Sequence, residues 1–101
     1  MQLTSAQRAD LRRQAHDLSP LVHIGKNGVT EHIVNNIDQA LTVHELIKVK
    51  FQDFQDQKRE LSDQIAEQLT AGLVGLIGNM AILYRRQPDP DRRRIPLLGV
   101  D

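Results

Sequence analysis

Two glycines three positions apart enclose a lysine and an asparagine in this sequence, in the tetrapeptide Gly25-Lys26-Asn27-Gly28. Because glycine has no Cβ, the backbone can turn sharply there, and a phosphodiester can approach the N–H groups of the loop. Lys26 adds a mobile positive charge at the same place. These residue types at this spacing therefore suit the noncovalent binding of a phosphate backbone.

The residues after the loop support this interpretation. Val29 and Thr30 have the pattern of a hydrophobic staple residue followed by an N-cap, so a helix should begin there. Its positive dipole end and unpaired N–H groups would then face the loop. The GXXG loops of KH domains clamp nucleic-acid backbones in this way. Many GxxG tetrapeptides are ordinary turns, however, and the loop alone leaves both interpretations open.

Hydrophobic periodicity indicates which elements position the loop. Helices are expected from Thr4 or Ser5 to about Leu18, from Thr30 to about Thr42, and from about Gln57 to Leu69. Strands are expected at residues 21–24, 45–51, 73–77 and 80–85, the last two joined through Gly78-Asn79. Gly72 is placed to end the third helix in a left-handed conformation. The order α-β-α-β-α-β-β predicts an α/β two-layer sandwich with a four-stranded mixed sheet.

Further basic residues lie on these elements. Arg12 and Arg13 fall on the exposed side of the first helix, where a solvated face and a nucleic-acid-binding face are equally compatible with the pattern. Lys48 and Lys50 alternate with apolar residues, which predicts a strand with one basic face. Arg85 closes the last strand. The functional interpretation of each basic residue competes with an ordinary solvated one.

The formal net charge is zero, from 13 basic and 13 acidic residues. The acidic residues are concentrated: five between Asp53 and Glu67, against Lys58 and Arg59, give minus three there and leave plus three elsewhere. If this acidic helix lies away from the binding surface, a neutral chain can still present a basic face. Beyond Arg86 the periodicity ends, so residues 87–101, with the run Arg92-Arg93-Arg94, are expected to form a flexible tail.

Several classes of function lack support. There is no cysteine, the four histidines (His16, His23, His32 and His44) are dispersed, and no catalytic signature is present, so we expect no enzyme, no metal and no cofactor. No apolar run approaches the roughly 20 residues that span a bilayer, and the first residues lack a signal-peptide pattern. We expect a cytoplasmic protein with no membrane or small-molecule partner, and the absence of a heptad seam favours a monomer.

Separated motifs in this order and spacing resemble one known family, the CRM-domain proteins of the YhbY type. The motifs lie within residues 3–86 and are Leu3-Thr4, Gln7-Arg8, Leu11-Arg12, Ala15-His16-Asp17-Leu18, Pro20, residues 24–30, residues 37–41, residues 44–50, Gly78 and Leu83-Tyr84-Arg85. The resemblance implies a fold similar to the C-terminal domain of translation initiation factor three, in one domain covering residues 1–86. Two departures are Ser19, where a basic residue is often found, and the aromatic stretch at residues 51–54.

The resemblance also implies a function. Bacterial single-domain members bind RNA and associate with precursors of the large ribosomal subunit, so the expected partner is 23S ribosomal RNA and the expected role is ribosome assembly. Residues 25–28 would clamp the RNA backbone, and Arg12 and Arg13 would extend that surface. A second hypothesis is a protein-interaction module whose acidic helix docks on a basic ribosomal protein. Charge reversal in the loop or in the acidic helix would distinguish the two hypotheses.

Overall fold

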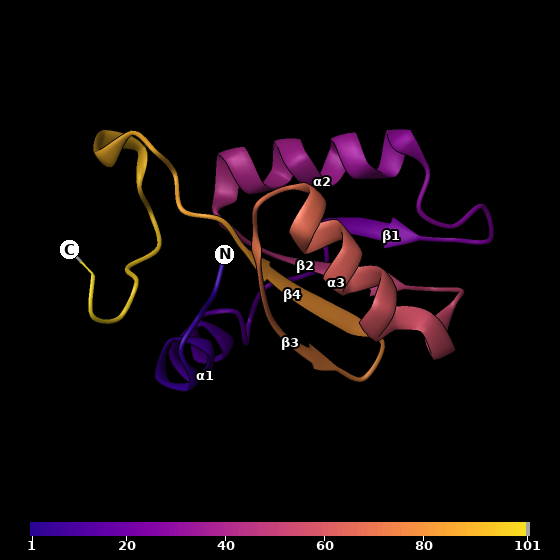
Figure 1. The fold of residues 1–101 in the computed structure, drawn as a ribbon, viewed down its shortest axis with the longest axis horizontal. Coiled ribbons are helices and arrows are strands. Elements are labelled where there is room, and N and C mark those ends of the chain that lie inside the picture. The colour runs from indigo at the N-terminus through magenta and orange to yellow at the C-terminus, as the bar shows by residue number, and fades with distance from the viewer. Residues whose placement is uncertain (101) are drawn as a thin grey trace.

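The computed structural model describes residues 1–100, which form three α-helices, four strands and two short 3-10 turns. Figure 1 shows their arrangement. The helices are α1 (Ser5–Gln14), α2 (Glu31–His44) and α3 (Lys58–Gln68), and the strands are β1 (Val22–Ile24), β2 (Leu46–Phe51), β3 (Gly72–Ile77) and β4 (Met80–Tyr84). The 3-10 turns are η1 (Gln55–Gln57) and η2 (Pro90–Arg92).

The four strands form one mixed sheet in the order β1-β2-β4-β3. β1 pairs with β2 in parallel, and β4 pairs antiparallel with both β2 and β3. The parallel pair requires a crossover between its strands, and α2 precedes β2 as that crossover. The predicted α/β class, with three helices and a four-stranded mixed sheet, is confirmed.

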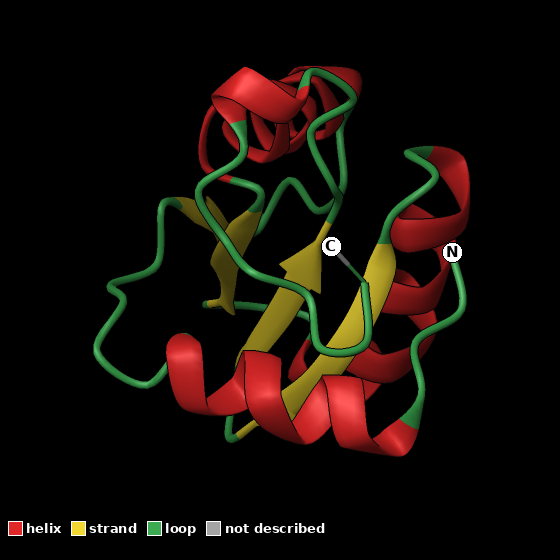
Figure 2. Cartoon of the chain, turned by 90° about the vertical axis from the view of Figure 1, so that its left-hand side faces the viewer, coloured by secondary structure: helices red, strands yellow, loops and turns green. Residues whose placement is uncertain are grey.

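Helices cover both faces of the sheet (Figure 2). On one face α2 and α3 bury Ile37 and Ile65 against Phe51 and the inward residues of β1, β2 and β4. Burial of a side chain such as Ile37 or Phe51 contributes about 1.5–3 kcal/mol. On the other face α1 buries Leu11 against a second cluster that includes Tyr84. α1 therefore adds a layer to the two that the sequence predicts.

The covering by α1 corrects the expectation of a solvated basic face on β2. The alternation is as predicted, because Val49 and Phe51 face α2 and α3 while Lys48 and Lys50 face the other way. Lys48 is only 9% exposed, however, and its Nζ donates to the carbonyl oxygen of His16 at 3.1 Å. The turn that follows α1 therefore covers this position, and Lys48 has a structural contact.

Two helix ends differ from the predicted positions. α1 begins at a capping box between Thr4 and Gln7 but ends at Gln14, four residues before the predicted Leu18. After α3, Thr70 takes the left-handed conformation predicted for Gly72, with a φ of 54°. Gly72 instead lies in β3, where a Cβ would come within 2.8 Å of the Leu3 side chain. Close packing against Leu3 is therefore what requires glycine at position 72.

Residues 87–97 lie against the domain, in contrast to the flexible tail predicted for residues 87–101. The carboxyl group of Glu45, which is 0% exposed, accepts hydrogen bonds from the backbone N–H groups of Gln87, Arg94 and Ile95. Leu97 is buried in the cluster under α1. Because a buried carboxyl group needs hydrogen-bond partners, Glu45 provides a physical reason for this docking.

Candidate nucleic-acid interface

The loop between β1 and α2 forms a tight turn at one end of the molecule. The N–H of Gly28 donates to the carbonyl oxygen of Gly25 at 2.9 Å, and Gly28 has a φ of 72°, which favours glycine. Lys26 and Asn27 occupy the exposed tip. Within residues 1–100, their backbone N–H groups and the Lys26 ammonium group have no protein acceptor. The tip therefore presents unpaired donors to a ligand.

The first turn of α2 adds donors beside the loop. Thr30 is the N-cap, and its hydroxyl oxygen accepts from the N–H of Ile33 at 3.2 Å, as the sequence predicts. The first intrahelical bond joins the N–H of Val34 to the carbonyl oxygen of Thr30, so the N–H groups of Glu31 and His32 lack intrahelical acceptors. A phosphate at the loop would meet the positive end of the helix dipole.

A row of side chains crosses all four strands beside the loop, on the face that α1 covers elsewhere. The register pairs His23 with Lys50, Lys50 with Met80, and Met80 with Ile77. Directly paired residues project from the same face. None of the four side chains is buried, and Ile77 is 49% exposed. We call these four residues, His23, Lys50, Met80 and Ile77, the sheet row. The sheet row places the Lys50 cation and two apolar side chains beside the loop.

Arg12 borders the sheet row from α1. Its Nη2 atom would lie 3.0 Å from a Cβ built on Gly75, so the guanidinium group lies over the backbone of β3. Arg12 is exposed and forms no ion pair within the described chain. Arg13 is also exposed but pairs with Asp10 at 3.2 Å. Of these two predicted site residues, Arg12 lies next to the sheet row and has its donors available.

Arg85, another predicted site residue, uses its donors inside the protein. Nη1 donates to Asp38 Oδ1 at 2.7 Å and to the Leu69 carbonyl oxygen at 3.0 Å, and Nη2 donates to the Asp38 carbonyl oxygen and to the Thr42 hydroxyl group. With Lys48 bound to His16, two of the predicted contact residues thus have internal roles. Neither residue is therefore part of the candidate interface.

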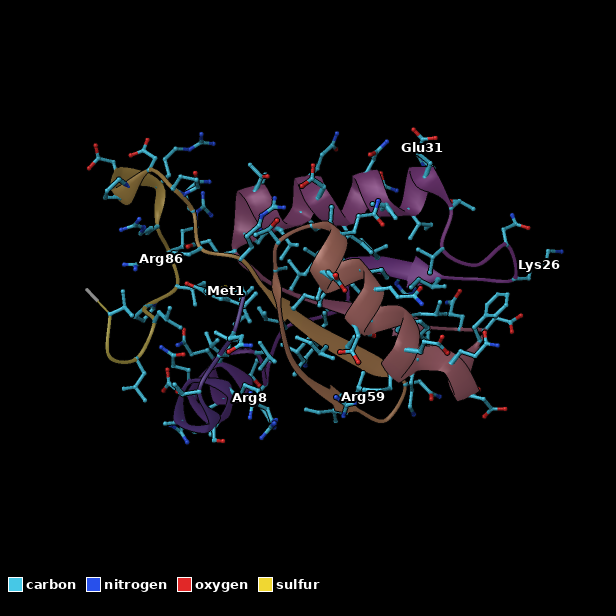
Figure 3. All side chains as sticks on the ribbon, in the orientation of Figure 1. Met1, Arg8, Lys26, Glu31, Arg59 and Arg86 are labelled. Carbon is cyan, nitrogen blue, oxygen red and sulfur yellow. The ribbon has the colours of Figure 1, made fainter. Side chains whose placement is uncertain are left out.

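The arginines of the C-terminal segment lie far from the loop. Figure 3 shows Lys26 extending from one end of the molecule and Arg86 at the opposite end. The longest axis of the molecule is 39 Å. The run Arg92-Arg93-Arg94 belongs to the Arg86 end, so these arginines and the loop cannot hold the same phosphate group.

The loop end also carries acidic residues. Glu31 lies in the first turn of α2, and Asp53 and Asp56 lie in the exposed segment that follows β2. Their charges reduce the positive potential that Lys26 and Lys50 create. We therefore expect the interface to hold few phosphates and to depend on the directed N–H donors of the loop as well as on charge.

The described residues contain no group of three histidine or acidic side chains placed to hold a metal ion. None of their helices combines the length and apolar character needed to cross a membrane. Tyr84 is fully buried in the cluster under α1, so its ring is a packing anchor in the core. Burial, followed by the nearby charge of Glu45, raises the pKa of its hydroxyl group above the usual 10.0.

The structure also brings together residues that sequence reasoning missed. His23 reaches the sheet row because Val22 and Ile24 face the core, a signal already present in the alternation of the short strand. Phe54 lies against Gly28, with its ring atom Cε2 3.3 Å from the position of a Cβ on that glycine. No local pattern indicates this second contact, because the two residues belong to different loops.

Comparison with known proteins gives consistent results. The CRS1/YhbY (CRM) domain model matches residues 3–85. A probable RNA-binding protein of Pseudomonas aeruginosa is 38% identical over 93 residues, which cover 91% of this chain and 89% of the relative. A probable RNA-binding protein of Bacillus subtilis is 33% identical over 95 residues, which cover 93% of this chain and 99% of the relative.

A solved structure supports the same relationship. The solution structure of a Staphylococcus aureus protein, described as a candidate RNA-binding protein, superposes with a TM-score of 0.79 at 36% identity. The match covers 94% of this chain and 100% of the solved one. With the family model matching most of its length, the chain belongs to the CRS1/YhbY (CRM) domain family.

Proposed function

We propose that the protein binds ribosomal RNA in precursors of the large ribosomal subunit and assists their assembly. The observation that carries the proposal is the loop tip, where the unpaired N–H groups of Lys26 and Asn27 lie beside the Lys26 ammonium group and the start of α2. The relatives named as RNA-binding proteins favour RNA over other phosphate-containing ligands. The protein would act in the cytoplasm as a ribosome-associated monomer, without a catalytic step.

In this proposal the loop clamps the RNA backbone and the sheet row supports the adjoining strand. Lys50 and Arg12 would contact neighbouring phosphates, since both cations are free of ion pairs within residues 1–100. Met80 and Ile77 would lie against sugars or bases. Backbone contacts of this kind position an RNA without reading its sequence. The partner would be 23S ribosomal RNA.

Sedimentation of cell lysates through a sucrose gradient tests the ribosome connection. We expect the wild-type protein to travel with large-subunit precursors and Lys26→Glu to stay near the top. Arg59→Glu is the matched control, because Arg59 is exposed on α3, unpaired in the described chain and distant from Lys26 in Figure 3. Equal sedimentation of all three proteins would contradict the loop clamp, and wild-type protein that does not co-sediment would contradict the ribosome connection.

Salt dependence of binding to purified RNA tests the phosphate contacts. Three cations, Lys26, Lys50 and Arg12, predict a slope of about −2 for log K against log salt concentration with single-stranded RNA. Lys26→Glu should make the slope shallower by about one, and Arg59→Glu should leave it unchanged. A slope near zero for the wild type would exclude a phosphate clamp.

A second candidate function uses the other charged surface. Asp56, Glu60 and Asp63 are exposed along η1 and α3 and have no partner within the described residues. Such a surface could dock on a basic ribosomal protein. In that case Lys replacements at the three positions would abolish co-sedimentation, while Lys26→Glu would have no effect. The RNA clamp requires the opposite result, so the same gradient decides between them.

A further inference from the structure

Phe54 stands beside the loop in an unusual backbone conformation. Its φ of 56° is in the left-handed region, which is uncommon for a residue with a bulky side chain. Asp53 Oδ1 accepts from the Phe54 N–H at 2.7 Å, and the Gln57 N–H donates to the Phe54 carbonyl oxygen at 3.0 Å. The surrounding residues thus hold Phe54 in place against a conformational cost of about 1 kcal/mol or more.

The position of the ring is not explained by the core. Phe51, three residues earlier, is fully buried and fills the core between the sheet and α3, whereas Phe54 stays partly exposed at the end of the molecule. One side of its ring packs against Gly28, with Cε2 and Cζ 3.3 and 3.5 Å from a Cβ position there. A larger residue at position 28 would displace the ring. The loop glycine therefore also makes room for an aromatic surface.

The charges around Phe54 select what the ring can bind. Asp53 and Asp56 are exposed beside it, and their carboxylates repel phosphates. An uncharged base is not repelled in the same way, and aromatic rings bind unpaired bases by stacking. The Gln57 side chain, which is exposed and has no partner within residues 1–100, could hydrogen-bond to a base edge. Phosphates would remain at the tip with Lys26.

We propose that Phe54 is a stacking platform for one unpaired RNA base, next to the backbone clamp formed by residues 25–28. This inference rests on the proposed RNA binding and deepens it, because it specifies single-stranded RNA, or a loop within structured RNA, as the substrate class. An intact duplex keeps its bases stacked on one another and has none to place on the ring.

The test uses two RNA probes and two variants. One probe is a hairpin with a single-stranded loop that contains 2-aminopurine, and the other is a blunt duplex of matched length. Phe54→Leu retains apolar packing against Gly28 but removes the aromatic face. Phe54→Trp retains the aromatic face and adds a fluorophore to a chain that has no tryptophan of its own.

We expect wild-type protein to quench 2-aminopurine in the hairpin loop. Phe54→Leu should bind the hairpin about tenfold more weakly and lose the quenching, with duplex binding unchanged. Phe54→Trp should restore hairpin affinity, and its emission should be quenched by the hairpin but not by the duplex. If Phe54→Leu fails to fold, the tryptophan emission of the second variant still decides the question.

Failure of the inference differs from failure of the proposed function. The inference is wrong if wild type and Phe54→Leu bind the hairpin equally with the same 2-aminopurine signal. It is also wrong if adding the hairpin leaves the tryptophan emission of Phe54→Trp unchanged. Phe54 then serves only to pack against the loop. In both cases Lys26→Glu would still weaken binding if the clamp exists. If the wild type binds neither probe, the proposed RNA binding itself is wrong.

Discussion

The guanidinium group of Arg85 binds both the side chain and the backbone of Asp38. Its Nη1 atom lies 2.7 Å from Asp38 Oδ1, and its Nη2 atom lies 2.9 Å from the Asp38 carbonyl oxygen. The same guanidinium group also reaches the Leu69 carbonyl oxygen. One side chain at the end of β4 thereby ties α2 to the end of α3. This arrangement needs the planar fork of arginine, which offers several donors in fixed directions.

Arg85→Lys should therefore destabilise the fold without weakening RNA binding. Lysine can retain the charge near Asp38 but not all the hydrogen bonds, and we expect the free energy of unfolding to fall by about 1–3 kcal/mol. Denaturant unfolding measures this loss, with Arg13→Lys on the exposed surface as the control. If Arg85→Lys lowers RNA affinity while stability stays constant, Arg85 belongs to the RNA-binding interface after all.

Gly28→Ala should weaken both stability and RNA binding for two reasons. Alanine is strained at the positive φ of this position, and its Cβ would press against the Phe54 ring. We expect a loss of about 1 kcal/mol of stability. Two other glycines separate the causes. At Gly78 the φ is 57°, but a new Cβ would contact nothing. At Gly25 a new Cβ would also contact nothing, and the φ is not positive.

Gly78→Ala should lower thermal stability and leave RNA affinity unchanged, whereas Gly25→Ala should have little effect on stability. Thermal unfolding and RNA titration of the three variants check these expectations. If Gly28→Ala and Gly78→Ala lower stability equally and neither changes RNA affinity, contact with the Phe54 ring is unimportant.

Tyr84 should make the fold sensitive to alkaline pH. Burial and then Glu45 raise the pKa of its hydroxyl group in the folded protein above the usual 10.0, so the folded state binds this proton more tightly than the unfolded state does. The resulting stability is fully present below pH 10 and is lost as pH rises through the folded pKa. Because Tyr84 is the only tyrosine and tryptophan is absent, ultraviolet absorbance follows its ionisation directly.

Tyr84→Phe should remove this part of the alkaline instability. Within the described residues the Tyr84 hydroxyl group is buried without a hydrogen-bond partner, so its removal at neutral pH should leave stability unchanged or raise it by up to about 1 kcal/mol. A loss greater than that in denaturant unfolding at neutral pH would mean that the hydroxyl group has a partner.

Glu45→Ala should release the C-terminal segment from the domain. The substitution removes the acceptor for the backbone N–H groups of Gln87, Arg94 and Ile95 and leaves these donors to find water. We expect faster amide hydrogen exchange over residues 87–97 and a stability loss of about 1–3 kcal/mol. Glu31→Ala, at an exposed carboxylate at the opposite end of α2, is the control. Unchanged exchange at Arg94 and Ile95 would show that other contacts hold the segment.

The sequence predicts elements that depend on neighbouring residues. The N-cap at Thr30 and the hairpin at Gly78 are local patterns, and the structure has both. The contacts of Lys48 and of the C-terminal segment depend on residues far along the chain. Alternation in β2 separates its two faces but does not reveal that α1 covers one of them. Glu45 likewise gives no local sign of its partners near Arg94.

The candidate site divides in the same way. Residues 25–28 are predictable because two glycines, a cation and a following helix are contiguous. The sheet row is only half predictable, since alternation places Lys50 on a face but the sheet order must bring His23 and Met80 beside it. The contact of Phe54 with Gly28 requires the ends of β1 and β2 to lie together, which follows from their parallel pairing.

Glu45 and its acceptor contacts also set an order of events during synthesis. Residues are added from the N-terminus at roughly 5–20 per second. Glu45 is made 49 positions before Arg94, one of its partners. A nascent chain can therefore form the β1-α2-β2 unit while this carboxyl group still faces water. Closure of the domain around Glu45 must wait until residues 94 and 95 have emerged, so the final docking step comes after every strand of the sheet has been made.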